Sequence, residues 1–194
     1  MRTFICNYHK EGHCKMNKLK FTAILLLSAL TATIVYILLH ETGHMIVMLS
    51  AGSKITEFSI LHAHVSGTPG NYTDFSDLWL HANGMLLPVI TGCVYALLYN
   101  RNLKNRFYRF FSFFLLTISF SAVLAWVLVP ILFMQGNAPG GDDVTKFLSN
   151  FAQDHSPLLV IAGAAVLFAA GLTLMIRKGV IRNYIEEIKA VKKS

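Results

Sequence analysis

Apolar residues occur along the chain in four long runs that are separated by short polar segments. These runs predict membrane spans at about 21–49, 84–99, 110–134 and 157–176. A helix that crosses a bilayer needs ~20 mostly apolar residues, and each run approaches or exceeds that length. The second run is the shortest and contains Pro88. The pattern predicts an α-helical polytopic membrane protein with about four transmembrane helices.

Two further segments depart from this apolar pattern. Residues 52–81 mix Ile, Phe and Val with Thr, Ser and His, which predicts a β-rich loop with a small hairpin between the first two spans. Residues 178–194 place apolar side chains at helical spacing among Lys and Arg, which predicts an amphipathic basic helix on the membrane surface. With an N-terminal tail over 1–18, the transmembrane domain covers 19–177. Met16 is an alternative start of the chain.

Composition supports a membrane protein and excludes other classes. Of the 194 residues, 54% are hydrophobic and 14% are charged, whereas soluble domains carry ~25% charged residues. Three cysteines are too few for a secreted disulfide scaffold. The net charge of +7 comes from Lys and Arg that flank the apolar runs and form no single stripe. We therefore expect no nucleic-acid partner.

The distribution of basic residues predicts the orientation in the membrane. Lys and Arg are concentrated in the N-terminal tail, in the segment 101–109 and in the C-terminal tail, while the other two connections carry only Lys54 and Lys146. Cytoplasmic segments of membrane proteins carry the excess of Lys and Arg. With four spans, all three basic segments fall on one side. We expect a multi-pass protein of the cell membrane with both termini in the cytoplasm.

The first span ends in the motif His40-Glu41-Thr42-Gly43-His44, which has the H-E-x-x-H pattern. Histidines at i and i+4 lie on one helix face and can bind one metal ion, and the intervening glutamate can activate a metal-bound water. Such polar groups are costly within a membrane span and are functional by default. The motif therefore predicts a Zn²⁺ site; the plainer interpretation is a helix mouth that faces water.

Catalytic zinc usually takes three protein ligands, so two histidines leave one ligand to be found. The turn 137–143 follows the third span and contains Asp142 and Asp143. The charge distribution places this turn on the same side of the membrane as His40 and His44. Either aspartate can be the third ligand, and the other can cap the following helix. We prefer Asp143 as the ligand.

Over residues 34–148 the chain resembles the site-2 protease family of intramembrane zinc metallopeptidases. The resemblance is carried by the H-E-x-x-H motif at the end of the first span, by Asn83-Gly84-Met85-Leu86-Leu87-Pro88 at the start of the second, and by the aspartate turn. In that family two histidines and a later aspartate bind zinc, and the glutamate is the general base. The resemblance implies these roles for His40, His44, Asp142 or Asp143, and Glu41.

These observations lead to an expected function and one alternative. We expect a zinc-dependent intramembrane endopeptidase that acts, within the lipid bilayer, on a membrane-spanning protein or a membrane-bound peptide. The aspartate turn is more compact than the family pattern, because only Ala138 separates Asn137 from Pro139 and two aspartates follow. The alternative is therefore a non-catalytic, metallopeptidase-like membrane protein that acts as a binding or regulatory partner.

Several other polar residues are weaker candidates. His62, His64 and His81 lie in or beside the loop and could bind substrate carbonyls or an oxyanion, although loop histidines are often simply exposed. The resemblance adds Asn83 as a candidate for substrate binding. The N-terminal tail holds a compact set of zinc-ligand residue types, namely Cys6, His9, His13 and Cys14.

Overall fold

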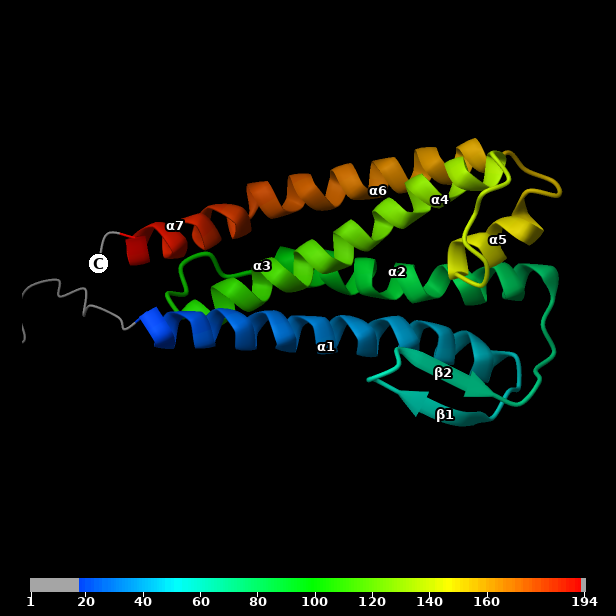
Figure 1. The fold of residues 1–194 in the computed structure, drawn as a ribbon, viewed down its shortest axis with the longest axis horizontal. Helices are drawn as coiled ribbons and strands as arrows, with labels where there is room; N and C mark the ends of the chain where they lie inside the picture. The colour runs from blue at the N-terminus through cyan, green and yellow to red at the C-terminus, as the bar shows by residue number, and fades with distance from the viewer. Residues whose placement is uncertain (1–17, 193–194) are drawn as a thin grey trace, which may run out of the picture.

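The computed structural model describes residues 18–192 and is mainly helical (Figure 1). Within this part of the chain, four helical segments are long and apolar enough to cross a membrane. They are α1 (Lys18–Ser50), α2 (Asp74–Leu98), the segment Arg106–Met134 and α6 (Pro157–Arg177). The predicted fold class, four spans with a small hairpin after the first, is confirmed.

The helices form a bundle in which α2 is central. Helix α1 packs on α2 and α3 (Arg106–Ser121), and α2 also contacts α5 (Asp143–Phe151) and α6. Along α2 the buried positions include Gly84, Met85, Pro88 and Gly92, and this spacing directs one helix face into the core. At one end of the bundle lie the start of α1 and helix α7 (Val180–Lys192), and at the other end lies α5 (Figure 1).

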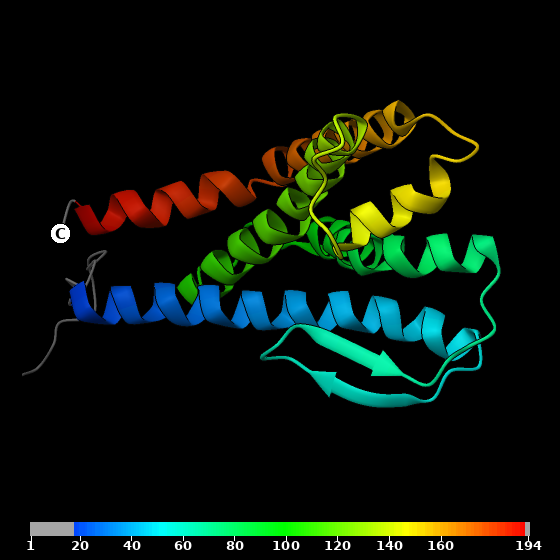
Figure 2. The ribbon, with the colours of Figure 1, turned by 45° about the vertical axis from the view of Figure 1, so that its right-hand side comes forward.

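The hairpin consists of β1 (Ile55–Ser59) and β2 (His64–Gly67), which pair antiparallel. Phe58 faces Val65 across the pair, and the register is irregular between Ile55 and Glu57. Strand β2 lies between α1 and β1 (Figures 1 and 2). The hairpin therefore runs back along α1 from the end of that helix.

The strands cover only part of the β-rich loop that we predicted over 52–81, because α2 begins at Asp74 and not near residue 84. Thr73 caps the helix, since its side chain accepts a hydrogen bond from Ser76 N and the Ser76 side chain accepts one from Thr73 N. The acidic Asp77 in the first turn also favours a helix start. These local signals outweigh the polar composition that suggested a loop.

The third span is not one straight helix. It consists of α3 (Arg106–Ser121), a 3-10 turn (Ala122–Leu124) and α4 (Ala125–Met134), whereas we predicted a single run over 110–134. Asn105 caps the start of α3 by accepting a hydrogen bond from Tyr108 N, so the helix begins before the apolar run. After this turn, α4 packs against α5 and α6.

The predicted C-terminal helix is α7, and it packs on α3 and α6. Its buried Glu187 forms ion pairs with Arg109 Nη1 at 2.9 Å and with Arg106 Nε at 3.0 Å. Tyr184 stacks on Phe113 with ring centroids 3.8 Å apart. These contacts hold α7 against the start of the third span.

Candidate metal centre

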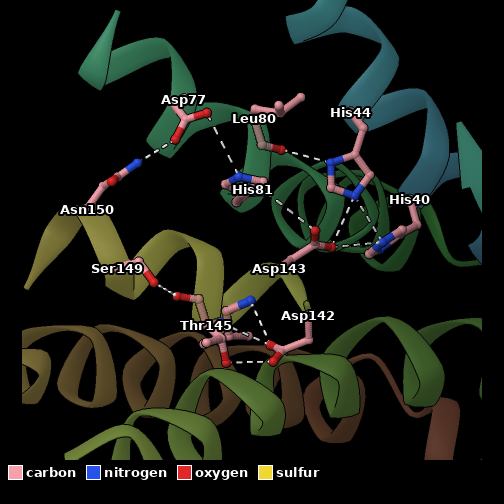
Figure 3. Close-up of polar contacts among 11 residues, drawn as sticks. His40, His44, Asp77, Leu80, His81, Asp142, Asp143, Thr145, Ser149 and Asn150 are labelled. Carbon is pink, nitrogen blue, oxygen red and sulfur yellow. Dashed lines mark hydrogen bonds and ion pairs between the residues drawn. The ribbon is translucent and has the colours of Figure 1, made fainter. Parts of the chain in front are cut away.

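The two motif histidines lie one above the other on α1, as their i, i+4 spacing requires. Their Nε2 atoms are 3.1 Å apart, and both rings point towards α5 (Figure 3). The His44 side chain is 11% exposed and that of His40 is 26% exposed. Local helix geometry therefore brings two nitrogen donors to one point.

The two aspartates of the turn before α5 have different roles. Asp142 caps α5, because its Oδ1 accepts hydrogen bonds from Val144 N at 2.9 Å and Thr145 N at 3.1 Å. Asp143, the first residue of the helix, extends towards α1 instead. Its Oδ2 lies 3.4 Å from His40 Nε2 and 3.1 Å from His44 Nε2 (Figure 3).

Three donor atoms thus form a nearly equilateral triangle with sides of 3.1, 3.1 and 3.4 Å. A tetrahedral ion with bonds of ~2.0–2.1 Å holds its ligand atoms ~3.3 Å apart, so one ion can reach all three donors. Two imidazoles and a carboxylate are also donors that suit a divalent transition metal. The cluster of His40, His44 and Asp143 could hold a metal ion.

The orientation of the His44 ring is set by a second contact. Its Nδ1 donates a hydrogen bond to the carbonyl oxygen of Leu80 on α2, at 2.8 Å. A proton on Nδ1 leaves the Nε2 lone pair free for a metal, which is the usual arrangement at histidine ligands. The Nδ1 atom of His40 is buried and has no hydrogen-bond partner in the described part of the chain. Histidine orientation at this centre is therefore held mainly through His44.

The surroundings of Asp143 favour the ionised carboxylate that a metal site requires. Burial by itself would raise the pKa of Asp143, but the close approach of His40, His44 and His81 holds this pKa well below its usual value. The carboxylate is thus charged over the whole physiological range of pH. Because α5 lies outside the candidate spans, the charge sits at the end of the bundle.

A cavity of about 460 Å³ opens beside the three donors. It is lined by residues of α1, β2, α2 and α5, among them Glu41, His81 and Lys146. Glu41 is only 3% exposed, and no hydrogen bond or ion pair within residues 18–192 engages its carboxylate. A free carboxylate therefore faces the same space as the metal donors.

The weaker candidates for substrate binding differ in whether they line this cavity. His64 lines the cavity, whereas His62 does not and its Nδ1 pairs with the Ser59 hydroxyl at 3.0 Å. Asn83 is not a lining residue, and its Nδ2 donates to the Gly43 carbonyl at 2.7 Å. Asn83 thus fastens α2 to α1. The predicted cluster of Cys6, His9, His13 and Cys14 lies outside the described residues.

Two glycines that sequence reasoning did not single out allow α1 and α2 to touch beside the donors. A Cβ atom at Gly84 would collide with His44 Nε2 and would lie 2.7 Å from His44 Cε1 and 2.9 Å from His40 Cε1. A Cβ atom at Gly43 would collide with the Asn83 carbonyl oxygen. Glycine inside an apolar helix was the signal that could have indicated such a close approach.

We expect Gly84→Ala to weaken metal binding strongly, by ~10-fold or more, because the new methyl group pushes both imidazoles away from Asp143. Chelator competition with the purified chain measures the change in metal affinity. Gly163→Ala is the matched control, since a Cβ atom at Gly163 on α6 meets nothing within 4 Å. Equal metal affinity of the two variants would contradict the close crossing of α1 and α2 at this point.

The candidate metal centre therefore combines a local motif with a distant residue. His40 and His44 come from one turn of α1, and Asp143 lies about 100 residues further along the chain. A scan against protein-family models and searches of curated proteins and of solved structures return no match to this chain, so its function has to be inferred from the geometry of its own residues.

Proposed function

We propose that the protein is a zinc-dependent intramembrane endopeptidase, similar to the site-2 protease family. The observation that carries the proposal is the meeting of His40, His44 and Asp143 beside a cavity lined by the free carboxylate of Glu41. Catalytic zinc sites have three protein ligands and keep a further position open. Here the H-E-x-x-H helix would supply two ligands and Asp143 the third, and the cavity would leave a further position open.

The chemistry divides between the metal and the protein. Held by His40, His44 and Asp143, zinc would supply Lewis acidity to the scissile carbonyl and to the attacking water. Glu41 takes the proton from the attacking water and passes it to the amine that leaves when the C–N bond breaks. Glu41 suits this role because it is buried, has no hydrogen-bond or ion-pair partner within residues 18–192 and shares the cavity with the donors.

The hairpin suggests how a substrate is presented to the site. Val65 and His64 of β2 line the cavity, and β2 lies on the side of the sheet next to α1. An extended peptide can add to the edge of a sheet through main-chain hydrogen bonds. An unwound segment of a membrane-spanning protein or a membrane-bound peptide would then lie with its backbone next to Glu41.

The arrangement of the helices supports a proposed orientation. The start of α1 and helix α7 lie at the end of the bundle opposite α5, the helix that carries Asp143 (Figure 1). The basic loop residues Arg101 and Arg106 precede or begin α3 at this same end, next to α7. By the positive-inside rule, both termini are cytoplasmic and the site faces the outer side of the cell membrane.

The test is cleavage of a single-span membrane protein by the full chain after both are reconstituted in liposomes. We expect cleavage with zinc present and complete loss after chelation, because without the metal nothing polarises the carbonyl or lowers the pKa of the water. Activity should return when zinc is added back. Zinc binding without any cleavage would instead support the alternative, a non-catalytic binding or regulatory protein.

A further inference from the structure

His81 on α2 lies between two carboxylates at the edge of the cavity. Its Nδ1 is 3.6 Å from Asp143 Oδ1, and its Nε2 is 3.9 Å from Asp77 Oδ1 (Figure 3). Both distances are longer than a hydrogen bond. The side chain is 14% exposed, and Nδ1 is buried without a hydrogen-bond partner. A buried ring nitrogen normally has a partner, and the acceptor that faces this one is Asp143.

The two oxygens of Asp143 have different surroundings. Oδ2 faces the Nε2 atoms of His40 and His44, which are the other two donors of the cluster. Oδ1 is turned away from them and faces His81. The carboxylate can therefore bind a metal through Oδ2 while its other oxygen is held from α2.

His81 is itself supported by residues that join α2 to α5. The Asn150 side chain donates a hydrogen bond to Asp77 Oδ2, while Asp77 Oδ1 faces His81 (Figure 3). Asn150 and Asp143 stand near opposite ends of α5. The series Asn150, Asp77, His81 and Asp143 therefore connects both ends of α5 to a single face of α2.

Helix α5 needs such support because it is short and follows a turn that contains two glycines. It has nine residues, and Gly141 just before it has φ of 87°, a conformation that glycine adopts readily. Apart from the contacts with α2, α5 is held by buried Val144 and Leu148 in the core. Apolar packing fixes the position of the helix, but it does not fix the rotation of the Asp143 carboxylate.

We propose that His81 is a positioning residue, which orients Asp143 so that Oδ2 stays available to the metal, and that Asp77 and Asn150 hold His81 in place. The proposal rests on the metal centre of the proposed function and adds a residue that the H-E-x-x-H motif does not contain. Carboxylates that bind metals are usually held by such outer partners, whose loss lowers metal affinity ~10–100-fold.

The experiment measures the zinc affinity of the purified full chain by competition with a chromophoric chelator. His81→Leu keeps a buried apolar side chain but removes both ring nitrogens, so we expect zinc affinity to fall ~10–100-fold. His81→Asn restores a donor close to the position of Nδ1, and we expect it to recover most of the loss. His155→Leu is the control, because His155 does not line this cavity and its ring packs at a tilt against Phe151.

A second variant and a spectrum separate positioning from folding. Asp77→Asn keeps the His81 side chain but removes the charge that faces Nε2 and weakens the hold on the ring, so we expect a smaller fall in affinity than for His81→Leu. The visible spectrum of the cobalt-substituted chain should change in His81→Leu and return towards wild type in His81→Asn. Loss of the fold alone would not be reversed by asparagine in this way.

The proposal is overturned if His81→Leu binds zinc as tightly as wild type, or if His81→Asn is no better than His81→Leu. Neither result bears on cleavage, because no substrate is present in these measurements. Conversely, a chain that binds zinc but cleaves nothing refutes the protease and leaves the role of His81 intact. A wild-type chain that binds no zinc refutes the metal centre, and both proposals with it.

Discussion

Glu41→Gln is expected to reduce the rate of substrate cleavage by ~10²–10⁴-fold, which is the usual contribution of a general base. Glutamine has the same size as glutamate, but its amide cannot accept a proton from water. Because Glu41 is not one of the three clustered donors, zinc content should stay at the wild-type level. The measurement pairs the cleavage rate in liposomes with the metal content of the same preparation.

Glu57→Gln is the matched control for this prediction. Glu57 lies on β1, is exposed and does not line the cavity, so the same chemical change should leave cleavage unaltered. Cleavage that persists in Glu41→Gln would refute the proposed role of Glu41. Loss of zinc together with cleavage would show instead that Glu41 supports metal binding.

Asp143→Ala is expected to abolish cleavage and to lower zinc affinity by more than ~100-fold, because the loss of a ligand exceeds the ~10–100-fold effect of losing an outer partner. Only the two Nε2 atoms of His40 and His44 would remain of the three-atom cluster. Chelator competition measures the affinity, and thermal unfolding of the metal-free protein reports any change in stability.

Substitution of the neighbouring Asp142 tests whether this residue is a helix cap or a metal ligand. Asp142→Ala removes the hydrogen bonds to Val144 N and Thr145 N and should cost ~0.5–2 kcal/mol of stability. Its zinc affinity should stay close to wild type, since its carboxylate is turned towards α5. The opposite outcome, with zinc lost in Asp142→Ala and kept in Asp143→Ala, would reassign the third ligand.

Much of the fold was predictable because membrane helices are encoded by long apolar runs. The four runs correspond to the four candidate spans, and the mixed segment between the first two contains the hairpin. We predicted that the second span begins near residue 84, about ten residues after the observed start of α2 at Asp74. The helix starts earlier because the capping box of Thr73 and Ser76 precedes the apolar run. That signal is local and was present in the sequence, but the polar composition of the segment concealed it.

Part of the candidate metal site is likewise predictable from the sequence, and part of it depends on the tertiary structure. The pairing of His40 and His44 follows from the helical repeat alone, so the sequence by itself determined it. The choice of Asp143 over Asp142 depends on how α5 approaches α1, and two adjacent aspartates do not reveal it. The same holds for His81, whose role depends on Asp77 beside it and on Asp143 from α5.

The sequence by itself determined the number of spans, the hairpin and the two histidines on one turn, because each depends on residues that are neighbours along the chain. Only the tertiary structure decided the third donor, the close crossing at Gly84 and the contact of Asn83 with Gly43. Those features join residues that are 40 to 100 positions apart, and their distances are set by the packing of α1, α2 and α5 rather than by any local preference of the backbone.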